Sequence, residues 1–396
     1  MKTSPETFER RILLVVMGLT PQIVTETLFK LAVQKTPAFI PTEVHLITTK
    51  KGAQSARLSL LGLGSEVGQF RLLCNDYKLT NIVFCERNIH IIPESESDFT
   101  SDSESRRHNI VASDFITRTV QQFTRDDSTA LHVSLAGGRK TMSYYAGYAL
   151  SLYGRIQDRL SHVLVNEPFQ SNKEFFFPPS TPRRFEVHNR WYSTADAQVI
   201  LSDIPYVRLH YHIPRKLLNG DSGFQDTVNI IQRFLGPPVV NADLESECIL
   251  INEQSIRLER SKFVLYLYFC ARRQSGLCPV EKDGVDGSLG IIEPYLQLYR
   301  QLYSEYSGYY ERAEAVLYDS ESGNRRRQAT ELAKKEKAWF GPHRSLINRT
   351  IRDTLGERFS KPFLIEVRER DDKVGYELDV PVEAIDIPFI KMTPMH

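Results

Sequence analysis

The chain has 396 residues and a formal net charge of +1. A hydrophobic fraction of 41% and a charged fraction of 25% are typical of a globular protein with a large core. The near-zero charge excludes a general attraction to nucleic acid, so any such binding has to come from local patches. No apolar run reaches the roughly 18 residues of a membrane span, and the five cysteines lack paired spacing, so we expect a cytoplasmic protein without membrane contact.

Strand and helix patterns alternate over residues 11–165, which predicts an α/β fold with a Rossmann-like parallel sheet. Strands are expected at residues 11–17, 43–49, 81–85, 130–136 and 162–165. Helices are expected between them at residues 21–35, 54–61, 66–76, 109–123 and 140–152. Such sheets bind ligands at the carboxyl ends of their strands, near a reversal of strand order.

A polar stretch, residues 93–109, predicts a loop within this region. A further strand is expected at residues 200–209 and a helix at residues 224–235, and Gly236-Pro237-Pro238 then marks a domain boundary. We therefore expect a Rossmann-like domain over residues 1–236 and a second domain over residues 237–396.

The second domain has a different order of elements. Short strands at residues 247–251 and 255–258 precede a helix at residues 259–273 and a long, tyrosine-rich helix within residues 287–317. Two further helices, residues 325–337 and 342–355, come before strands at residues 363–368 and 375–380. A small sheet, helices and a final hairpin are the order of a winged helix-turn-helix domain.

The most informative motif lies between the strand at residues 130–136 and the following helix. Gly137-Gly138 allows a ligand to approach the backbone, and the helix N-terminus behind it offers free N–H groups to an anion. Arg139 and Lys140 add two cations, which together indicate a phosphate site. The spacing does not fit a Walker A loop. The alternative is a tight turn with solvated Arg and Lys side chains, and the motif alone does not decide between them.

A second loop, residues 18–22, follows the first expected strand and therefore lies at the same edge of the predicted sheet. Thr20 would serve as an ordinary helix N-cap with Pro21 after it, but its hydroxyl also lies at the edge that holds Lys140. Thr48 and Thr49 end the second expected strand at this same edge. Two anion-friendly loops at one edge favour a ligand with several phosphates.

No pattern indicates a metal or a cofactor. His132 lies within an apolar strand, so we expect it to be a core residue. The sequence contains no H-E-x-x-H motif and no Ser-His-Asp arrangement.

The helix at residues 342–355 is a candidate nucleic-acid contact. Residues 325–361 contain 11 Lys and Arg against 4 Asp and Glu, a net charge of +7. A basic helix with a wing suits the major groove of DNA, whereas the alternative is a solvated helix face. The expected DNA contacts are Arg344, Asn348, Arg349 and Arg352.

Four stretches, residues 18–27, 41–49, 132–142 and 166–169, resemble the CRISPR-associated Rossmann-fold (CARF) ring nucleases. The resemblance extends over residues 8–210. It implies a homodimer that binds cyclic oligoadenylate, with cyclic tetra-adenylate, the second messenger of type III CRISPR systems, as the expected ring. A two-fold dimer suits a ring that has two-fold symmetry of its own.

The resemblance also implies the roles of site residues. Similar ring nucleases carry a lysine at the position of Lys140, which would stabilise charge on the phosphorane, and a small hydroxyl residue at the position of Thr20, to which we assign an orienting role. Because the ring supplies its own nucleophile, the ribose 2′-OH, we expect slow, metal-independent cleavage to products with 2′,3′-cyclic phosphate ends. The remaining ligand-binding residues are expected to be Gly18, Leu19, Pro21, Gln22, Thr48, Thr49, Ala136, Gly137, Gly138, Arg139, Thr141 and Met142.

Two other functions stay open. The chain could be a transcription regulator that senses cyclic oligoadenylate and binds DNA through its second domain. An RNase effector activated by the same ligand is less consistent, because no recognisable nuclease domain follows residue 245.

Overall fold

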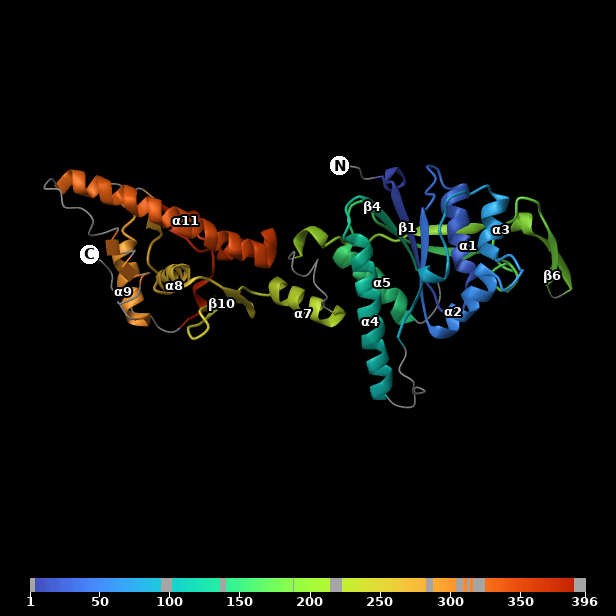
Figure 1. Ribbon diagram of the computed structural model, residues 1–396, viewed down its shortest axis with the longest axis horizontal. Coiled ribbons are helices and arrows are strands. Elements are labelled where there is room, and N and C mark those ends of the chain that lie inside the picture. The colour runs from blue at the N-terminus through green and yellow to red at the C-terminus, as the bar shows by residue number, and fades with distance from the viewer. Residues whose placement is uncertain are drawn as a thin grey trace. The chain divides into compact units, whose positions relative to one another are not determined.

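A computed structural model describes residues 4–93, 102–135, 140–187, 189–213, 223–282, 288–303, 308, 310–311, 314–315 and 325–387. The chain divides into two compact units (Figure 1). The first unit consists of Met1–Tyr211 with Leu217–Val228, and the second of His212–Lys216 with Asn229–His396.

A six-stranded sheet forms the centre of the first unit. Its strand order is β3-β2-β1-β4-β5-β8, with β1 to β5 parallel and β8 antiparallel at the edge. The alternation of strands and helices confirms the predicted α/β, Rossmann-like fold. The strands are β1 (Arg10–Val16), β2 (Glu43–Thr48), β3 (Ile89–Ile91), β4 (Thr129–Leu135), β5 (Arg159–Val165) and β8 (Val199–Asp203).

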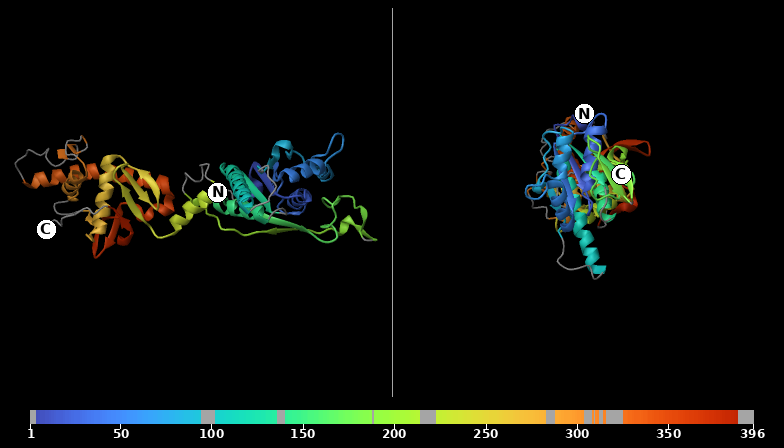
Figure 2. Two further views of the ribbon diagram at one scale, coloured as in Figure 1. Left: turned by 90° about the horizontal axis from the view of Figure 1, so that it is seen from below. Right: turned by 90° about the vertical axis from the view of Figure 1, so that its right-hand side faces the viewer.

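Helices cover both faces of this sheet (Figure 1). One face holds α1 (Gln22–Phe29), α2 (Lys50–Ala56) and α3 (Gln69–Asp76), and π-helical turns Lys30–Gln34 and Arg57–Leu61 extend α1 and α2. The other face holds α4 (Asp102–Thr124), which extends past the sheet (Figure 2, right), and α5 (Lys140–Tyr153).

The apolar run of β1 follows from this two-sided cover. Leu13 and Val15 pack beneath α1, whereas Ile12, Leu14 and Val16 pack beneath α4 and α5. In a strand that is buried on both faces, successive side chains all pack into the core, so its sequence is a continuous apolar stretch.

Smaller elements complete the first unit. An antiparallel hairpin joins β6 (Arg184–Val187) to β7 (Arg190–Ser193), and α7 (Phe224–Leu235) leads into the second unit. Short 3-10 turns lie at Pro5–Thr7, Glu86–Asn88, Thr194–Asp196 and His210–His212.

Two expectations for this unit are wrong. Residues 81–85 form no strand and contribute one isolated bridge, from Val83 to Glu43, while the strand at this edge is Ile89–Ile91. The polar stretch at residues 93–109 becomes helix α4 from Asp102 onward, and residues 94–101 lie outside the described residues.

The second unit contains two small sheets and three longer helices among its described residues. One sheet has the order β11-β10-β9-β15 and the other β12-β14-β13. The elements are β9 (Val240–Asp243), β10 (Cys248–Ile251), β11 (Gln254–Arg257), α8 (Arg260–Gln274), β12 (Val280–Glu281), α9 (Ile292–Leu302), α11 (Arg325–Ser360), β13 (Glu366–Arg370), β14 (Lys373–Glu377) and β15 (Ile385–Asp386), with 3-10 turns at Lys361–Phe363 and Val382–Ala384.

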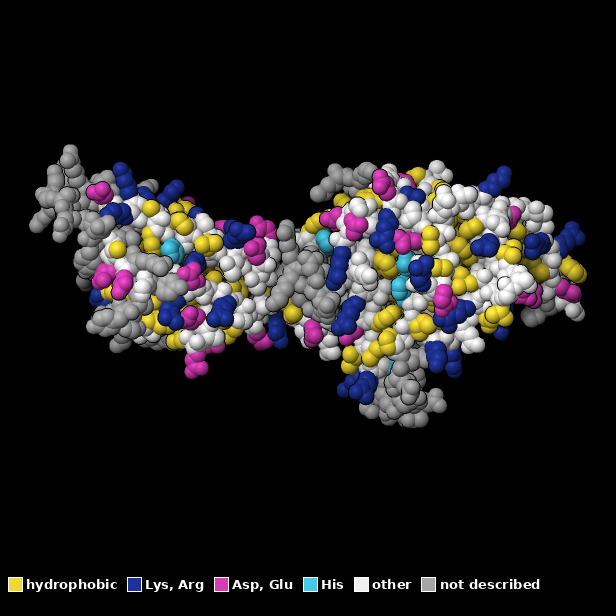
Figure 3. Space-filling view, viewed as in Figure 1, with side chains coloured by type: hydrophobic (Ala, Val, Ile, Leu, Met, Phe, Trp, Pro, Cys, Tyr) yellow, Lys and Arg dark blue, Asp and Glu magenta, His cyan; other side chains and the backbone are white. Residues whose placement is uncertain are grey.

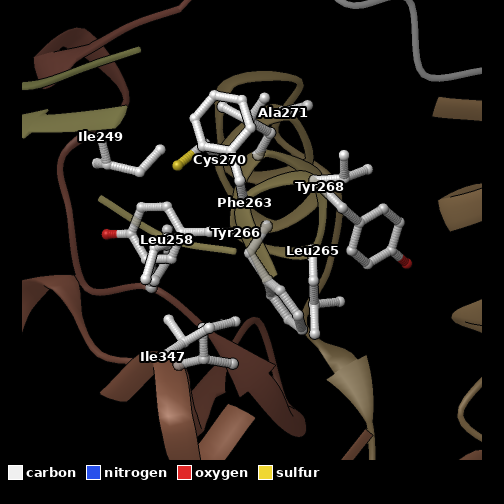
Figure 4. Close-up of a cluster of buried hydrophobic side chains, with 14 of the residues drawn as sticks. Ile249, Leu258, Phe263, Leu265, Tyr266, Tyr268, Cys270, Ala271 and Ile347 are labelled. Carbon is white, nitrogen blue, oxygen red and sulfur yellow. The ribbon is translucent and has the colours of Figure 1, made fainter. Parts of the chain in front are cut away.

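Helix α8 forms the centre of the second unit's core (Figure 4). All residues from Phe263 to Ala271 are buried, so the helix is covered on every side. Ile249 from β10 and Ile347 from α11 pack against it.

The basic helices predicted at residues 325–337 and 342–355 are one helix, which runs through Pro342 to a break at Gly356. Proline removes one backbone hydrogen bond, but Phe340, Ile347 and Ile351 are buried in the core on either side of it and hold the helix in place. Of the long helix expected within residues 287–317, the structure describes Ile292–Leu302 as α9.

Candidate functional site

The carboxyl edge of the first sheet brings three connections together. Val16, the last residue of β1, lies in register with Ile47 of β2 on one side and with Leu135 of β4 on the other. The chain therefore leaves β1, β2 and β4 at neighbouring points. Strand order reverses here, because β2 and β3 lie on one side of β1 while β4 and β5 lie on the other. Open α/β sheets bind their ligands at such a point.

The connection after β1 presents a free hydroxyl. Gly18 is buried, whereas Leu19 and Thr20 are exposed, and Pro21 occupies the N-cap position of α1 without a side-chain cap. The ordinary N-cap role considered for Thr20 is therefore absent. The Thr20 hydroxyl has no hydrogen-bond partner among the described residues, so it is available to a ligand.

Two threonines at the end of β2 lie between this loop and α2. Thr48 is fully buried and its hydroxyl donates to the carbonyl oxygen of Gly18 at 3.2 Å. Thr49 caps α2 by accepting a hydrogen bond from the backbone N–H of Gly52 at 3.2 Å. Both hydroxyls are thus used within the protein: that of Thr48 holds the β1 loop against β2, and that of Thr49 caps the first turn of α2.

Gly52 makes this close approach possible. A Cβ atom at this position would lie 2.1 Å from Oγ1 of Thr48 and 2.2 Å from the carbonyl oxygen of Gly18. No side chain fits there, so glycine is required for packing.

Helix α5 begins on the other side of β1. Lys140 is its first residue and is exposed, and it has no ion-pair partner in the described part of the chain. Thr141 is half-buried, and Met142 is buried in the core between the sheet, α4 and α5. The predicted residues Ala136, Gly137, Gly138 and Arg139 lie outside the described residues.

An open cavity of about 790 Å³ lies at this edge, on the α1 side. Four of the predicted residues line it, namely Leu19, Thr20, Pro21 and Gln22. The remaining walls come from Ser55 and Ser59 near α2, from β5 around His162 to Val165, and from the segment after β5 that contains Phe169, Lys173 and Phe176. This volume is within the range of roughly 300–1,000 Å³ that is usual for small-molecule sites.

The segment after β5 is fastened to α1. Gln22 donates from Nε2 to the carbonyl oxygen of Lys173 at 2.8 Å, and Thr25 donates to that of Phe176 at 2.6 Å. The Oε1 atom of Gln22 is buried without a partner in the described structure. The wall of the cavity therefore contains an acceptor that has no donor.

A buried carboxyl group lies one helical turn further along α1. Glu26 lines the cavity with only 7% of its surface exposed. Burial raises its pKa to about 7, and no described residue pairs with it. Near neutral pH this side chain therefore exists partly as a neutral carboxylic acid, which can donate as well as accept a hydrogen bond.

The profile of the family described as CRISPR-associated protein NE0113 matches residues 20–237, which is more than half of the chain. The chain belongs to this family. It is a CRISPR-associated protein, and the matched region includes Thr20, Glu26, Lys140 and every residue that lines the cavity except Leu19. No curated protein matches the chain.

Three residues of this site were missed by sequence reasoning: Glu26, His162 and Gly52. Glu26 could have been noticed as the one charged residue in the otherwise uncharged run of α1. Nothing comparable marks His162, whose Nδ1 lies 2.6 Å from the carbonyl oxygen of Leu135.

The residues expected to contact DNA lie along α11 of this CRISPR-associated protein and mostly face their own unit. Asn348 is buried, and its amide bonds the backbone N–H and carbonyl of Ile365. Arg352 pairs with Glu366 on β13 and Arg344 lies over the ring of Tyr376 on β14, so both tie α11 to the final hairpin. Arg349 is exposed, and its Nε atom lies 3.6 Å from Oδ2 of Asp353.

On the face of the second unit drawn in Figure 3, Lys and Arg are interspersed with Asp and Glu among the coloured residues. Within the described part of the chain, no three His, Cys, Asp or Glu side chains converge as metal ligands would. None of the helices in that part has both the length and the apolar character that crossing a membrane requires.

Proposed function

We propose that this protein binds cyclic oligoadenylate, with cyclic tetra-adenylate as the preferred ring, and cleaves it to linear products, which attenuates type III CRISPR signalling. The observation that carries the proposal is the juxtaposition of Thr20 and the N-terminus of α5 on either side of the strand-order reversal, next to a cavity of about 790 Å³. Membership of a CRISPR-associated family and the resemblance to CARF ring nucleases supply the ligand class.

The reaction that fits this edge uses the ring's own nucleophile. The 2′-oxygen of one ribose attacks the adjacent phosphorus, the bond from phosphorus to the 5′-oxygen breaks, and the products carry a 2′,3′-cyclic phosphate and a 5′-hydroxyl. The proton leaves the 2′-OH, and the departing 5′-oxygen gains one. The protein's task is to hold oxygen and phosphorus in line and to stabilise the phosphorane.

Lys140 and Thr20 have the chemistry for these tasks. Lys140 is exposed and without a counter-ion in the described structure, so its ammonium group is available to the extra negative charge of the phosphorane. The unpartnered Thr20 hydroxyl can orient a non-bridging phosphate oxygen by donating to it. Gly18, Leu19, Pro21, Gln22, Thr141 and the predicted residues 136–139 complete the proposed contact surface. Met142 lies in the core, and the Thr48 hydroxyl supports the β1 loop.

We further propose a homodimer and a winged-helix character for the second unit. A ring with two-fold symmetry is best matched by two copies of the same edge. The order of the second unit, a small sheet, helices α8, α9 and α11, and the β13–β14 hairpin, supports the winged-helix proposal. Because Asn348, Arg344 and Arg352 are engaged within that unit, we favour ring cleavage over a DNA-binding regulator.

Lys140 provides the test. Purified protein is incubated with cyclic tetra-adenylate, and the products are followed by liquid chromatography, with ring binding measured separately. We expect Lys140→Ala to lower the cleavage rate by at least about a hundredfold and binding by less, in line with loss of one transition-state charge contact. Undiminished cleavage by Lys140→Ala, or an intact ring with the unchanged protein, would contradict the proposal.

A further inference from the structure

The α1 wall of the cavity contains two hydrogen-bonding groups that have no partner among the described residues. Gln22 and Glu26 are separated by one helical turn, so their side chains are neighbours on the same face of α1. Both line the cavity, Oε1 of Gln22 is buried and unpartnered, and Glu26 is 93% buried without a partner in the described structure. Such groups cost free energy unless a ligand satisfies them.

The orientation of the Gln22 amide is fixed. Its Nε2 atom donates to the carbonyl oxygen of Lys173, which can only accept, so Oε1 is the atom left over. This atom demands a donor from the ligand, and a keto oxygen opposite it would be repelled.

We propose that Gln22 and Glu26 together read the edge of an adenine base placed in this cavity. The carboxylic acid of Glu26 donates its proton to N1 of adenine and accepts one hydrogen of the exocyclic N6 amine. The Oε1 atom of Gln22 accepts the other N6 hydrogen. This assignment rests on the proposed function for the identity of the ligand, and it adds the residues that select adenine.

The surroundings of the pair suit a flat heterocycle. Phe169 and Phe176 are almost fully buried and line the same cavity, as do Ile23 and Val163. The remaining lining includes polar side chains, among them Ser55, Ser59 and Lys173, so the cavity offers a base both apolar and polar contacts. Because Oε1 of Gln22 and the Glu26 side chain are buried, each base-edge hydrogen bond contributes more to selectivity than it would at the surface.

Glu26 makes adenine binding depend on pH, because only its protonated form can donate to N1. Burial alone raises the pKa of this carboxyl to about 7. The titratable groups along the cavity from neighbouring elements are His162 on β5 and Lys173 in the following segment, while the α2 side contributes the hydroxyls of Ser55 and Ser59. Since His162 and Lys173 are unchanged in a Glu26 variant, that variant isolates the contribution of Glu26.

The test uses a cyclic tetra-adenylate in which every ribose is 2′-deoxy, since this ring cannot cleave itself. We expect its Kd for the unchanged protein to rise by roughly tenfold per pH unit above pH 7, as for one linked proton. The variant Glu26→Gln keeps a donor and an acceptor at all pH values, so its Kd should stay within about threefold between pH 6.5 and 8.5. Glu26→Leu should bind at least about tenfold more weakly at pH 6.5.

A matched ring with inosine in place of adenosine tests the contacts of Gln22 and Glu26 together, because inosine carries a hydrogen on N1 and an oxygen where adenine has the N6 amine. We expect this deoxy-inosine ring to bind at least about tenfold more weakly at pH 6.5. Equal affinity for both rings, or the same pH profile for the unchanged protein and Glu26→Gln, would overturn the base-reading assignment even if the ribo-ring is cleaved. Conversely, adenine-selective, pH-dependent binding without cleavage of the ribo-ring would refute only the proposed enzyme activity.

Discussion

The Nδ1 atom of His162 lies 2.6 Å from the carbonyl oxygen of Leu135. Leu135 ends β4, and His162 lies on β5 just beyond the last residue pair of these strands, Ser134 with Ser161. Since a carbonyl oxygen only accepts, Nδ1 carries the hydrogen. The bond holds the end of β4 where the backbone ladder stops, immediately before the connection that leads to Lys140.

His162 is therefore expected to act as a positioning residue. Asparagine can place an amide N–H near the position of Nδ1, whereas leucine cannot donate. We expect His162→Leu to lower kcat for ring cleavage by about tenfold, comparable to one hydrogen bond, with KM changed by less than about threefold. His162→Asn should retain most of the activity. Equal loss in both variants would show that the bond to Leu135 is not what matters.

Gly52 offers a test of how the β1 loop is supported. Alanine at this position would collide with Oγ1 of Thr48 and the carbonyl oxygen of Gly18, so we expect Gly52→Ala to destabilise the protein by about 1–3 kcal/mol. The control is Gly147→Ala in α5, where a Cβ atom meets its nearest neighbours at 3.7 Å. This change should stabilise by about 0.5–1 kcal/mol. Denaturant unfolding at pH 7 measures both, and a neutral Gly52→Ala would contradict the packing argument.

Glu26 should make stability depend on pH in the absence of ligand. Its pKa is raised from 4.5 to about 7 by burial, so between these values the folded protein holds a proton that the unfolded chain has released. Stability from this group is therefore complete below pH 4.5, falls as pH rises, and is lost above pH 7. The shift corresponds to about 3 kcal/mol.

The variant Glu26→Gln lacks this titration. The free energy of unfolding of Glu26→Gln minus that of the unchanged protein should increase by about 3 kcal/mol from pH 4.5 to pH 8. Other buried groups, such as His132, whose pKa burial lowers to about 3, affect both proteins equally. A difference that stays flat with pH would mean that the Glu26 carboxyl is solvated or paired.

The proposed homodimer predicts a solution mass of twice 45.5 kDa by light scattering. If the ring lies across two copies, the cleavage rate per chain should fall on dilution at the concentration where the mass falls. A monomer that cleaves the ring at full rate would contradict a shared site.

The sequence was sufficient for the α/β fold because the central strands β1, β2 and β4 are mostly buried and apolar, and helical patterns separate them along the chain. The prediction of a strand at residues 81–85 was wrong, because two successive segments of the chain pair with the same side of β2. Val83 bonds the backbone of Thr42 and Val44, the chain then turns through Glu86–Asn88, and Ile89–Ile91 pairs further along the same strand. The turn is held by Asn88, which accepts from the backbone N–H of Cys85, and hydrophobic periodicity does not detect such a contact.

The candidate site was also predicted only in part. The motifs placed it at the carboxyl ends of β1, β2 and β4, because strand ends and turns are local features of the sequence. Glu26 and His162 were missed because their roles depend on tertiary structure. Glu26 is buried with no partner among the described residues, and His162 bonds a carbonyl 27 residues away in the chain. Thr48 and Thr49 were chosen as ligand contacts, yet their hydroxyls bond Gly18 and Gly52 within the protein.

The most direct test of the central claim follows the oxygen atoms during ring cleavage. Cyclic tetra-adenylate is incubated with excess protein in ¹⁸O-labelled water containing EDTA, and the first products are analysed by mass spectrometry. Attack by the ribose 2′-OH predicts linear products with 2′,3′-cyclic phosphate ends and no ¹⁸O. An intact ring, or first products that carry ¹⁸O from water, would contradict the account.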